Sequence, residues 1–172
     1  MRITILALTL VALASACSTR QIRVSPASDL RSLGSSIQLE INGGDVDPAV
    51  INDLKRYLKG KLIIAGFDIE SADAQGIQLQ VDVHSYSAGS AGARLTVGFG
   101  AGRGSLLYLA RYTSSDGQVL AEMDGAEYFT GGEPHFNSKY GTFATMGGAE
   151  KAQNILVQEA AEHIVELALG EK

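Results

Sequence analysis

Three histidines, His84, His135 and His163, are the side chains of this sequence best suited to metal binding or proton transfer. A zinc site needs three or four ligands at defined spacing, and the sequence contains no HExxH motif, no CxxC motif and no histidine triplet. We therefore expect no metal site and no cofactor. Each histidine is expected to lie at the surface or at the edge of the core.

A long polar and glycine-rich segment, residues 131–148, could carry nucleophilic chemistry because it holds His135, Ser138 and Lys139. The sequence has no G-x-S-x-G nucleophile elbow, and it shows no pair of carboxylates on an evident cleft wall. We therefore assign no catalytic residue and expect a protein that is not an enzyme. The alternative is a small periplasmic ligand-binding domain or hydrolase that uses residues 131–148, since loops often carry function.

The only cysteine, Cys17, follows an apolar run at residues 3–13 and the small residues Ala14, Ser15 and Ala16. A helix that spans the ~30 Å hydrocarbon layer needs about 20 apolar residues, so this run is too short and is typical of a signal peptide. The small residues before Cys17 resemble the lipobox of bacterial lipoproteins. This resemblance implies that residues 1–16 are removed and that Cys17 becomes an acylated N-terminus.

The alternative for Cys17 is an ordinary secretory signal that is cut after Ala16 and leaves a free thiol. A lone cysteine in an oxidising compartment cannot form an internal disulfide, so modification explains it better. Two or more acyl chains anchor a protein stably, whereas one gives only marginal membrane binding. In the lipoproteins that this segment resembles, a residue such as Ser18 after the cysteine usually accompanies transfer to the outer membrane, facing the periplasm.

Without residues 1–16 the chain has 156 residues, with 13 basic and 19 acidic side chains and a net charge of −6. This length is usual for one domain, which we place at residues 37–172. The acidic balance argues against a nucleic-acid partner and against adhesion to anionic lipid by charge. Attachment to the membrane must therefore come from the lipid anchor.

Residues 17–36 are rich in Ser, Arg and Thr, and their few apolar residues are too sparse to bury a face. We interpret this segment as the acylated N-terminus followed by a flexible tether. The alternative is that Ile22 and Val24 belong to an extended strand that docks on the sheet.

Alternation of apolar and polar residues predicts strands, and helical spacing of apolar residues predicts two helices. Asp47 and Pro48 are typical of a helix start, and Gly66 of a helix end. Each strand is apolar on one side only, so both helices should cover the same face of a mostly antiparallel sheet. The prediction is an α+β two-layer sandwich in the order β-α-β-β-β-α. The expected strands are 37–42, 77–84, 105–113 and 119–130, with a further one suggested at 95–99, and the expected helices are 48–65 and 149–169.

Four glycines, Gly98, Gly100, Gly102 and Gly104, recur at every second position. This spacing is not the G-x-G-x-x-G of a dinucleotide site, and no helix follows it. In a strand the four would leave one face bare, which lets another backbone approach closely. Our hypothesis is a close-packing site for a partner, and the alternative is an internal bend of the chain.

The predicted hairpin of residues 105–130 has a second face that mixes large apolar and charged residues. An apolar patch with a charged rim is the composition of a modest protein-binding surface. The alternative is that the tether or residues 131–148 fold over this patch. The predicted patch consists of Leu107, Leu109, Leu120 and Tyr128, and its rim of Arg111, Glu122 and Asp124.

Residues 93–104, 106–109 and 116–121 carry a Gly-Phe-Gly-x-Gly segment before a strand and then an Asp-Gly hairpin turn followed by Val-Leu. This pattern resembles the bacterial domain of unknown function 4410 family. The resemblance covers residues 37–169 and is strongest over 94–132. It implies an exported, often lipidated protein without a known activity. We therefore expect a lipid-anchored envelope protein that serves as a protein-binding or assembly module, with the partner and the oligomeric state left open.

Overall fold

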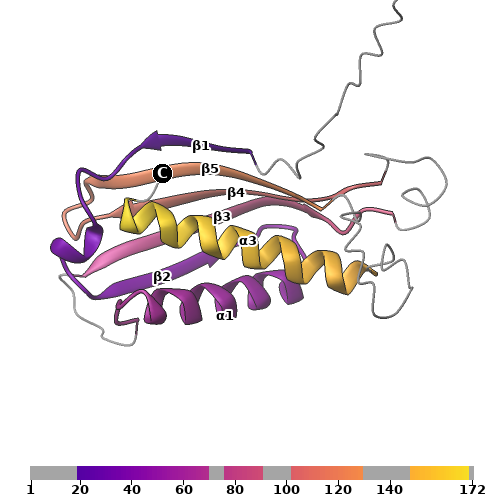
Figure 1. Ribbon diagram of the computed structural model, residues 1–172, viewed down its shortest axis with the longest axis horizontal. Helices are drawn as coiled ribbons and strands as arrows, with labels where there is room; N and C mark the ends of the chain where they lie inside the picture. The colour runs from indigo at the N-terminus through magenta and orange to yellow at the C-terminus, as the bar shows by residue number, and fades with distance from the viewer. Residues whose placement is uncertain (1–18, 70–75, 91–101, 130–147, 171–172) are drawn as a thin grey trace, which may run out of the picture.

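The computed structural model describes residues 19–69, 76–90, 102–129 and 148–170 (Figure 1). Five strands form one sheet in the order β1-β5-β4-β3-β2. The strands are β1 (Thr19–Val24), β2 (Ile37–Asn42), β3 (Ile77–Ser87), β4 (Gly104–Thr113) and β5 (Val119–Phe129). The helices are the short 3-10 helix η1 (Leu30–Ser32), α1 (Pro48–Ile64) and α3 (Ala149–Leu169).

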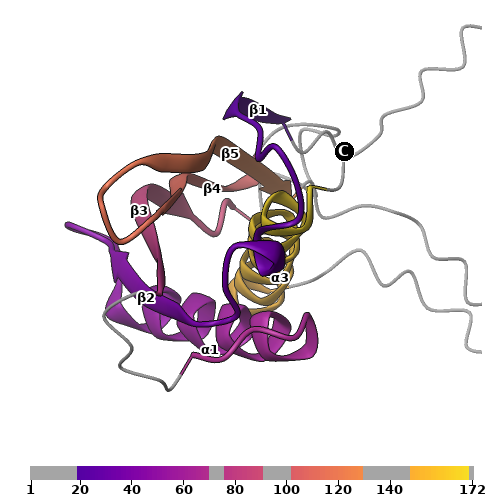
Figure 2. The ribbon, with the colours of Figure 1, turned by 90° about the vertical axis from the view of Figure 1, so that its left-hand side faces the viewer.

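The sheet is mixed but mostly antiparallel. Strands β2 and β3 are parallel because helix α1 crosses between them, and every other neighbouring pair is antiparallel. Figure 2 shows that α1 and α3 lie on the same side of the curved sheet. The predicted α+β architecture, with its element order and its helices on one face, is confirmed.

Helix α1 begins and ends where local chemistry predicts. The Asp47 side chain accepts a hydrogen bond of 2.8 Å from the Ala49 amide, and Pro48 occupies the first turn, where its missing N–H costs nothing. Leu54, Leu58 and Leu62 form the buried stripe of the helix. Gly66 follows the helix with a φ of +93°, a conformation that glycine adopts without a Cβ clash.

Helix α3 is buried on two sides because it packs against both α1 and the sheet. Small residues on α3 allow this close approach, and Leu156 and Ile164 fill the space between them. Within the described ranges, neither helix is long and apolar enough to cross a bilayer. The small buried residues of α3 are Ala152, Ala160, Ala161 and Ala168.

The inner face of the hairpin formed by β4 and β5 agrees with the alternation of the sequence, except at one end. Tyr108 and Tyr112 are buried there together with Met123. The alternation of Ala121 and Met123 would also turn Val119 to this face, but its side chain is 37% exposed. The register shifts between Tyr112 and Thr113, and this irregularity turns the first residue of β5 outward.

The segment expected to be a flexible tether is instead part of the fold from Thr19 onward. Strand β1 pairs antiparallel with β5, with Thr19 opposite Ala126, and Leu30 is 1% exposed in the core. The alternative, a docked strand, is therefore the observed structure, and the domain begins at β1 rather than at residue 37. Sparse apolar residues suffice because backbone hydrogen bonds to the edge of β5 supply much of the contact.

The prediction that Gly102 belongs to a strand with alternating glycines is wrong. This residue has a φ of +68° and lies before β4, which begins at Gly104. The Ser90 amide donates a hydrogen bond of 2.8 Å to the Gly102 carbonyl oxygen, and a Cβ on Gly89 would lie 2.1 Å from that oxygen. Gly102 thus serves a close approach within the chain. Gly98, Gly100 and the suggested strand at 95–99 lie outside the described residues.

Candidate functional site

The apolar patch predicted on the hairpin lies on the outer face of the sheet, opposite both helices. Strand pairing brings its members together, because Leu109 lies opposite Asp124 and Leu107 opposite Ala126 on the neighbouring strand. We call this surface the outer patch. Its residues Leu107, Leu109 and Tyr128 are partly exposed. Leu120, which the sequence also placed in this patch, packs against the core instead, because the register shift between Tyr112 and Thr113 leaves it at an irregular position of the hairpin.

Two ion-paired arginines border the outer patch. The Arg111 Nε donates to the Glu122 carboxylate at 2.5 Å, and Arg23 from β1 pairs with Asp124 and lies 3.5 Å from Glu122. The sequence predicted three of these charges but missed Arg23, because the strand that carries it was expected to be a tether. Strand β1 therefore flanks the patch and adds to its rim rather than folding over it. Residues 131–148, which could also cover the patch, lie outside the described residues.

A hollow of about 280 Å³ adjoins the outer patch between strands β1, β3, β4 and β5. His84 and Leu107 line it together with Gln21 and Asp124. The register of β3 shifts between Val83 and Ser85, so His84 occupies an irregular position of the strand and is exposed. The hollow offers an imidazole and a carboxylate for hydrogen bonding to a bound group.

A second hollow, of about 700 Å³, lies where β2 and β3 end and α1 begins. Two of its acidic side chains already have partners, because Asp47 caps α1 and Asp82 accepts hydrogen bonds from Asn42 and Gln80 at 3.1 and 3.0 Å. In the part of the chain that the structure describes, no three His, Cys, Asp or Glu side chains are grouped so as to hold a metal ion.

A buried polar network joins the inner face of the hairpin to α3. Glu127 is fully buried, accepts a hydrogen bond of 2.9 Å from the Tyr108 hydroxyl and lies 2.8 Å from His163 Nδ1. The hydrogen bond with Glu127 raises the pKa of His163, and burial followed by the charge of Glu127 raises the pKa of Tyr108. Because Glu127 exposes no surface to a substrate, this network acts on the fold.

Sequence reasoning missed the role of Glu127. The signal was present, because Glu127 continues the inward-facing alternation of Met123 and Gly125 along β5. The other residues with possible chemistry, His135, Ser138 and Lys139, lie outside the described residues, as does Cys17. The hydrolase alternative and the lipid anchor therefore stay predictions.

Three solved structures are similar to this chain, and the first of them shows the same fold. The PelC dodecamer from Paraburkholderia phytofirmans has a TM-score of 0.54 and 12% identity, over 91% of this chain and 99% of that chain. A PelC variant dodecamer from the same organism has a TM-score of 0.48 and 13% identity, with the same coverage. A protein from Caulobacter crescentus that is proposed to be a lipoprotein has a TM-score of 0.39 and 15% identity, over 74% of this chain and 87% of that chain. No curated protein matches the chain.

A family model matches residues 38–132, which is more than half of the chain. The match runs from β2 to just past the end of β5, so it includes α1, the outer patch and the buried network's Tyr108 and Glu127. The chain therefore belongs to the family described as Domain of unknown function (DUF4410).

Proposed function

We propose that this protein is a lipoprotein of the cell envelope, anchored in the outer membrane through Cys17 and facing the periplasm, whose domain binds a protein partner. The observation that carries the binding role is the outer patch, a group of large apolar side chains on the sheet face that neither helix covers. The anchor itself rests on the signal-like residues 1–16 and the single cysteine.

The chemistry of the outer patch favours a protein as the ligand. The rim charges are satisfied by one another, because Arg111 pairs with Glu122 and Arg23 with Asp124. A partner that covers Leu107 and Leu109 would therefore gain apolar contact without having to neutralise an unpaired charge. Truncating a central apolar residue should weaken such an interface more than truncating a rim charge.

A second copy of this chain is the first partner to test. The structurally similar PelC is a dodecamer, so a domain of this fold is able to assemble from copies of itself. A different envelope protein is the other partner that the outer patch would suit.

Cross-linking in intact cells tests the binding role. A photo-reactive amino acid at Leu109 should give a discrete cross-linked product that mass spectrometry identifies, either as this chain or as another protein. The matched control carries the same group at Lys59, which is exposed on α1 on the other side of the molecule. Equal products from both positions, or none from Leu109, would contradict the proposal.

The anchor has its own test. Cells that express the full chain are labelled with an alkyne analogue of palmitate, and the N-terminal peptide is weighed after purification. We expect label on the wild type, none on Cys17→Ala, and a mature chain that begins at residue 17. An unlabelled wild type in the soluble fraction would refute the anchor and leave the outer patch to be judged by the cross-links.

A further inference from the structure

The position of β1 limits where a lipid anchor meets the domain. Strand β1 begins at Thr19, two residues after Cys17, and two residues span at most about 7 Å. Thr19 lies opposite Ala126, and antiparallel pairing directs the chain before Thr19 toward Phe129, which is about 10 Å farther along β5. The opposite end of β5, at Val119, is about 24 Å from Ala126. Cys17 can therefore reach about the level of Tyr128 but not the other end of the sheet.

The side chains at this end suit a lipid headgroup layer. Tyr128 and Phe129 end β5, and the guanidinium of the exposed Arg103 lies 4.2 Å from the centre of the Tyr128 ring. Aromatic residues with a polar tip are enriched where membranes meet water, and long cationic side chains place their charge at the headgroups there. We call Arg103, Tyr128, Phe129 and the adjoining end of β3 at Ser87 the anchor end.

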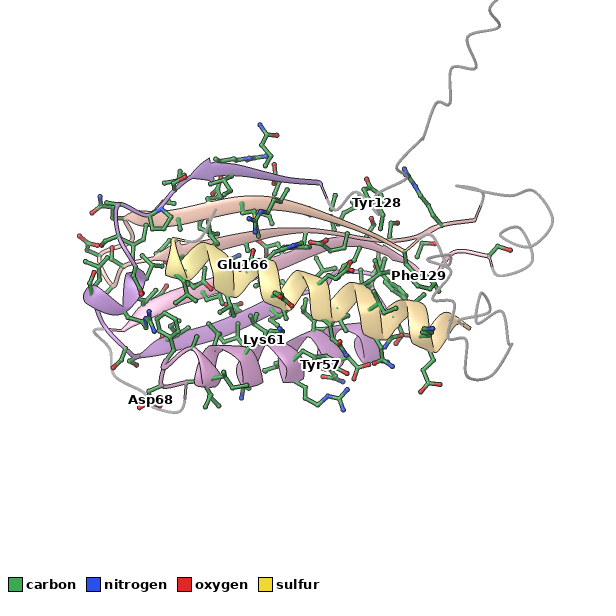
Figure 3. The ribbon with its side chains drawn as sticks, in the orientation of Figure 1. Tyr57, Lys61, Asp68, Tyr128, Phe129 and Glu166 are labelled. Atoms are coloured by element: carbon green, nitrogen blue, oxygen red, sulfur yellow. The ribbon has the colours of Figure 1, made fainter. Side chains whose placement is uncertain are left out.

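The opposite end of the domain exposes both acidic and apolar side chains. The turn between β4 and β5 exposes Asp116, and the segment after α1 exposes Asp68. Figure 3 shows Asp68 at the end of the molecule remote from Tyr128 and Phe129. Ile63 and Ile64 at the end of α1 are exposed as well, so the reach of Cys17, and not the character of the side chains, distinguishes the two ends.

We propose that the anchor end lies against the lipid headgroups, so that the strands stand away from the membrane and the outer patch faces sideways along it. This inference deepens the proposed function and rests on acylation of Cys17. Leu109 lies opposite Asp124, which is four residues from Tyr128 along β5, so the patch extends about 14 Å away from the membrane. A neighbour anchored in the same leaflet can meet such a sideways surface without leaving the membrane.

Two exposed serines at opposite ends of the sheet provide a matched test. Ser87 ends β3 at the anchor end, and Ser115 lies in the turn between β4 and β5. The full acylated protein is purified as Ser87→Cys or Ser115→Cys, and each new cysteine receives a small fluorophore. Acylation blocks the Cys17 sulfur, so each variant carries one label. The proteins are reconstituted in vesicles of phosphatidylethanolamine and phosphatidylglycerol with nitroxide-labelled headgroups.

We expect the fluorophore at Ser87 to be quenched several-fold more than the fluorophore at Ser115. Stronger quenching at Ser115, or equal and weak quenching at both sites, would overturn the orientation while leaving the acylated protein and its outer patch intact. Fluorophore attached to Cys17, together with a protein that does not bind vesicles, would instead show an unacylated chain. That result would overturn both the anchor and the orientation that depends on it.

Discussion

Glu127 is the residue on which the interior of the hairpin depends. A carboxylate that exposes no surface destabilises a fold unless hydrogen bonds compensate for the lost hydration, and here the Tyr108 hydroxyl and the His163 ring supply such contacts. The three side chains belong to β5, β4 and α3. The network therefore fixes how the last helix sits on the sheet.

Removing this carboxylate should destabilise the protein. We expect Glu127→Ala to lower the free energy of unfolding by about 2 to 4 kcal/mol, because the buried Tyr108 hydroxyl loses its acceptor and a cavity forms. Urea denaturation measures the change. The control is Glu150→Ala on the exposed first turn of α3, which should stay within about 0.5 kcal/mol of the wild type. Equal changes in the free energy of unfolding for the two variants would show that the network does not stabilise the fold.

The same network predicts a pH dependence. The hydrogen bond with Glu127 raises the pKa of His163 above its ordinary value near 6.5, against opposing effects of burial and Arg20. A raised folded-state pKa gives stability that is complete below about pH 6.5 and is lost as the pH rises through the folded value.

We therefore expect wild-type stability to fall, relative to His163→Gln, as the pH rises above about 6.5, because only the wild type carries the titrating imidazole. Urea midpoints across this range provide the measurement. Parallel curves for the two proteins would contradict the prediction. Glu159, whose pKa is raised mainly by burial, is present in both proteins.

Two glycines should respond in opposite directions to an added methyl group. A Cβ on Gly125 would lie 2.0 Å from the buried Tyr108 ring, whereas a Cβ on Gly60 in α1 meets no atom within 4 Å. We expect Gly125→Ala to destabilise by about 1 to 3 kcal/mol and Gly60→Ala to stabilise by about 0.5 to 1 kcal/mol. Thermal unfolding of both variants tests this. A stabilised Gly125→Ala would mean that the Tyr108 ring is free to move.

At the scale of elements, the position of strand β1 depends on its contacts with both β5 and α3. It is an edge strand, and Arg20 crosses the layers to pair with Glu166 on α3 at 2.5 Å. Because β1 follows the proposed anchor directly, a force on the lipid would reach the domain through this strand. The ion pair ties β1 to the helix layer, and strand pairing ties β1 to β5.

Arg20→Ala should therefore loosen β1 more than it destabilises the whole domain. We expect amide hydrogen exchange at residues 19–24 to become several-fold faster, while the free energy of unfolding drops by about 1 kcal/mol or less. The control, Arg56→Ala, removes an exposed ion pair with Asp53 within α1 and should leave β1 unchanged. Unaltered exchange in β1 would show that pairing with β5 alone holds the strand.

At the scale of the whole molecule, the two faces of the sheet differ, and we propose that the outer face is the one used for binding. The helices and the inner sheet face contain the core, whereas the outer face carries a patch that the fold itself does not bury. A substitution there should affect association more than stability. Large apolar side chains are also exposed at the end of α1, Ile63 and Ile64, and after η1, Leu33. The alternation and helical spacing used above did not single out these three residues.

Leu109→Asp tests this separation. We expect its free energy of unfolding to stay within about 1 kcal/mol of the wild type, because Leu109 is only partly buried, while the cross-linked product at the outer patch is lost. The product is followed with the photo-reactive group at Leu107 in both backgrounds. Lys59→Asp is the control and should keep the product. Persistence of the product in Leu109→Asp would remove the outer patch from the interface.

The sequence by itself determined those features whose cause is local. Period-two alternation identified the strands β2 to β5, and the cap at Asp47 with the glycine at position 66 set the limits of α1 within about one residue. One-sided strands were enough to place both helices on one face, since a strand with one apolar side has one side to cover.

Only the tertiary structure decided features that depend on contacts distant in sequence. Strand β1 forms because β5 offers an open edge more than 100 residues later, which no composition window over residues 17–36 can detect. The burial of Glu127 depends on Tyr108 and on His163 from the last helix, and the turn at Gly102 depends on the approach of residues 89 and 90. Pairing partners that are remote along the chain set the energy of these groups, and so the fold had to be known before their roles could be assigned.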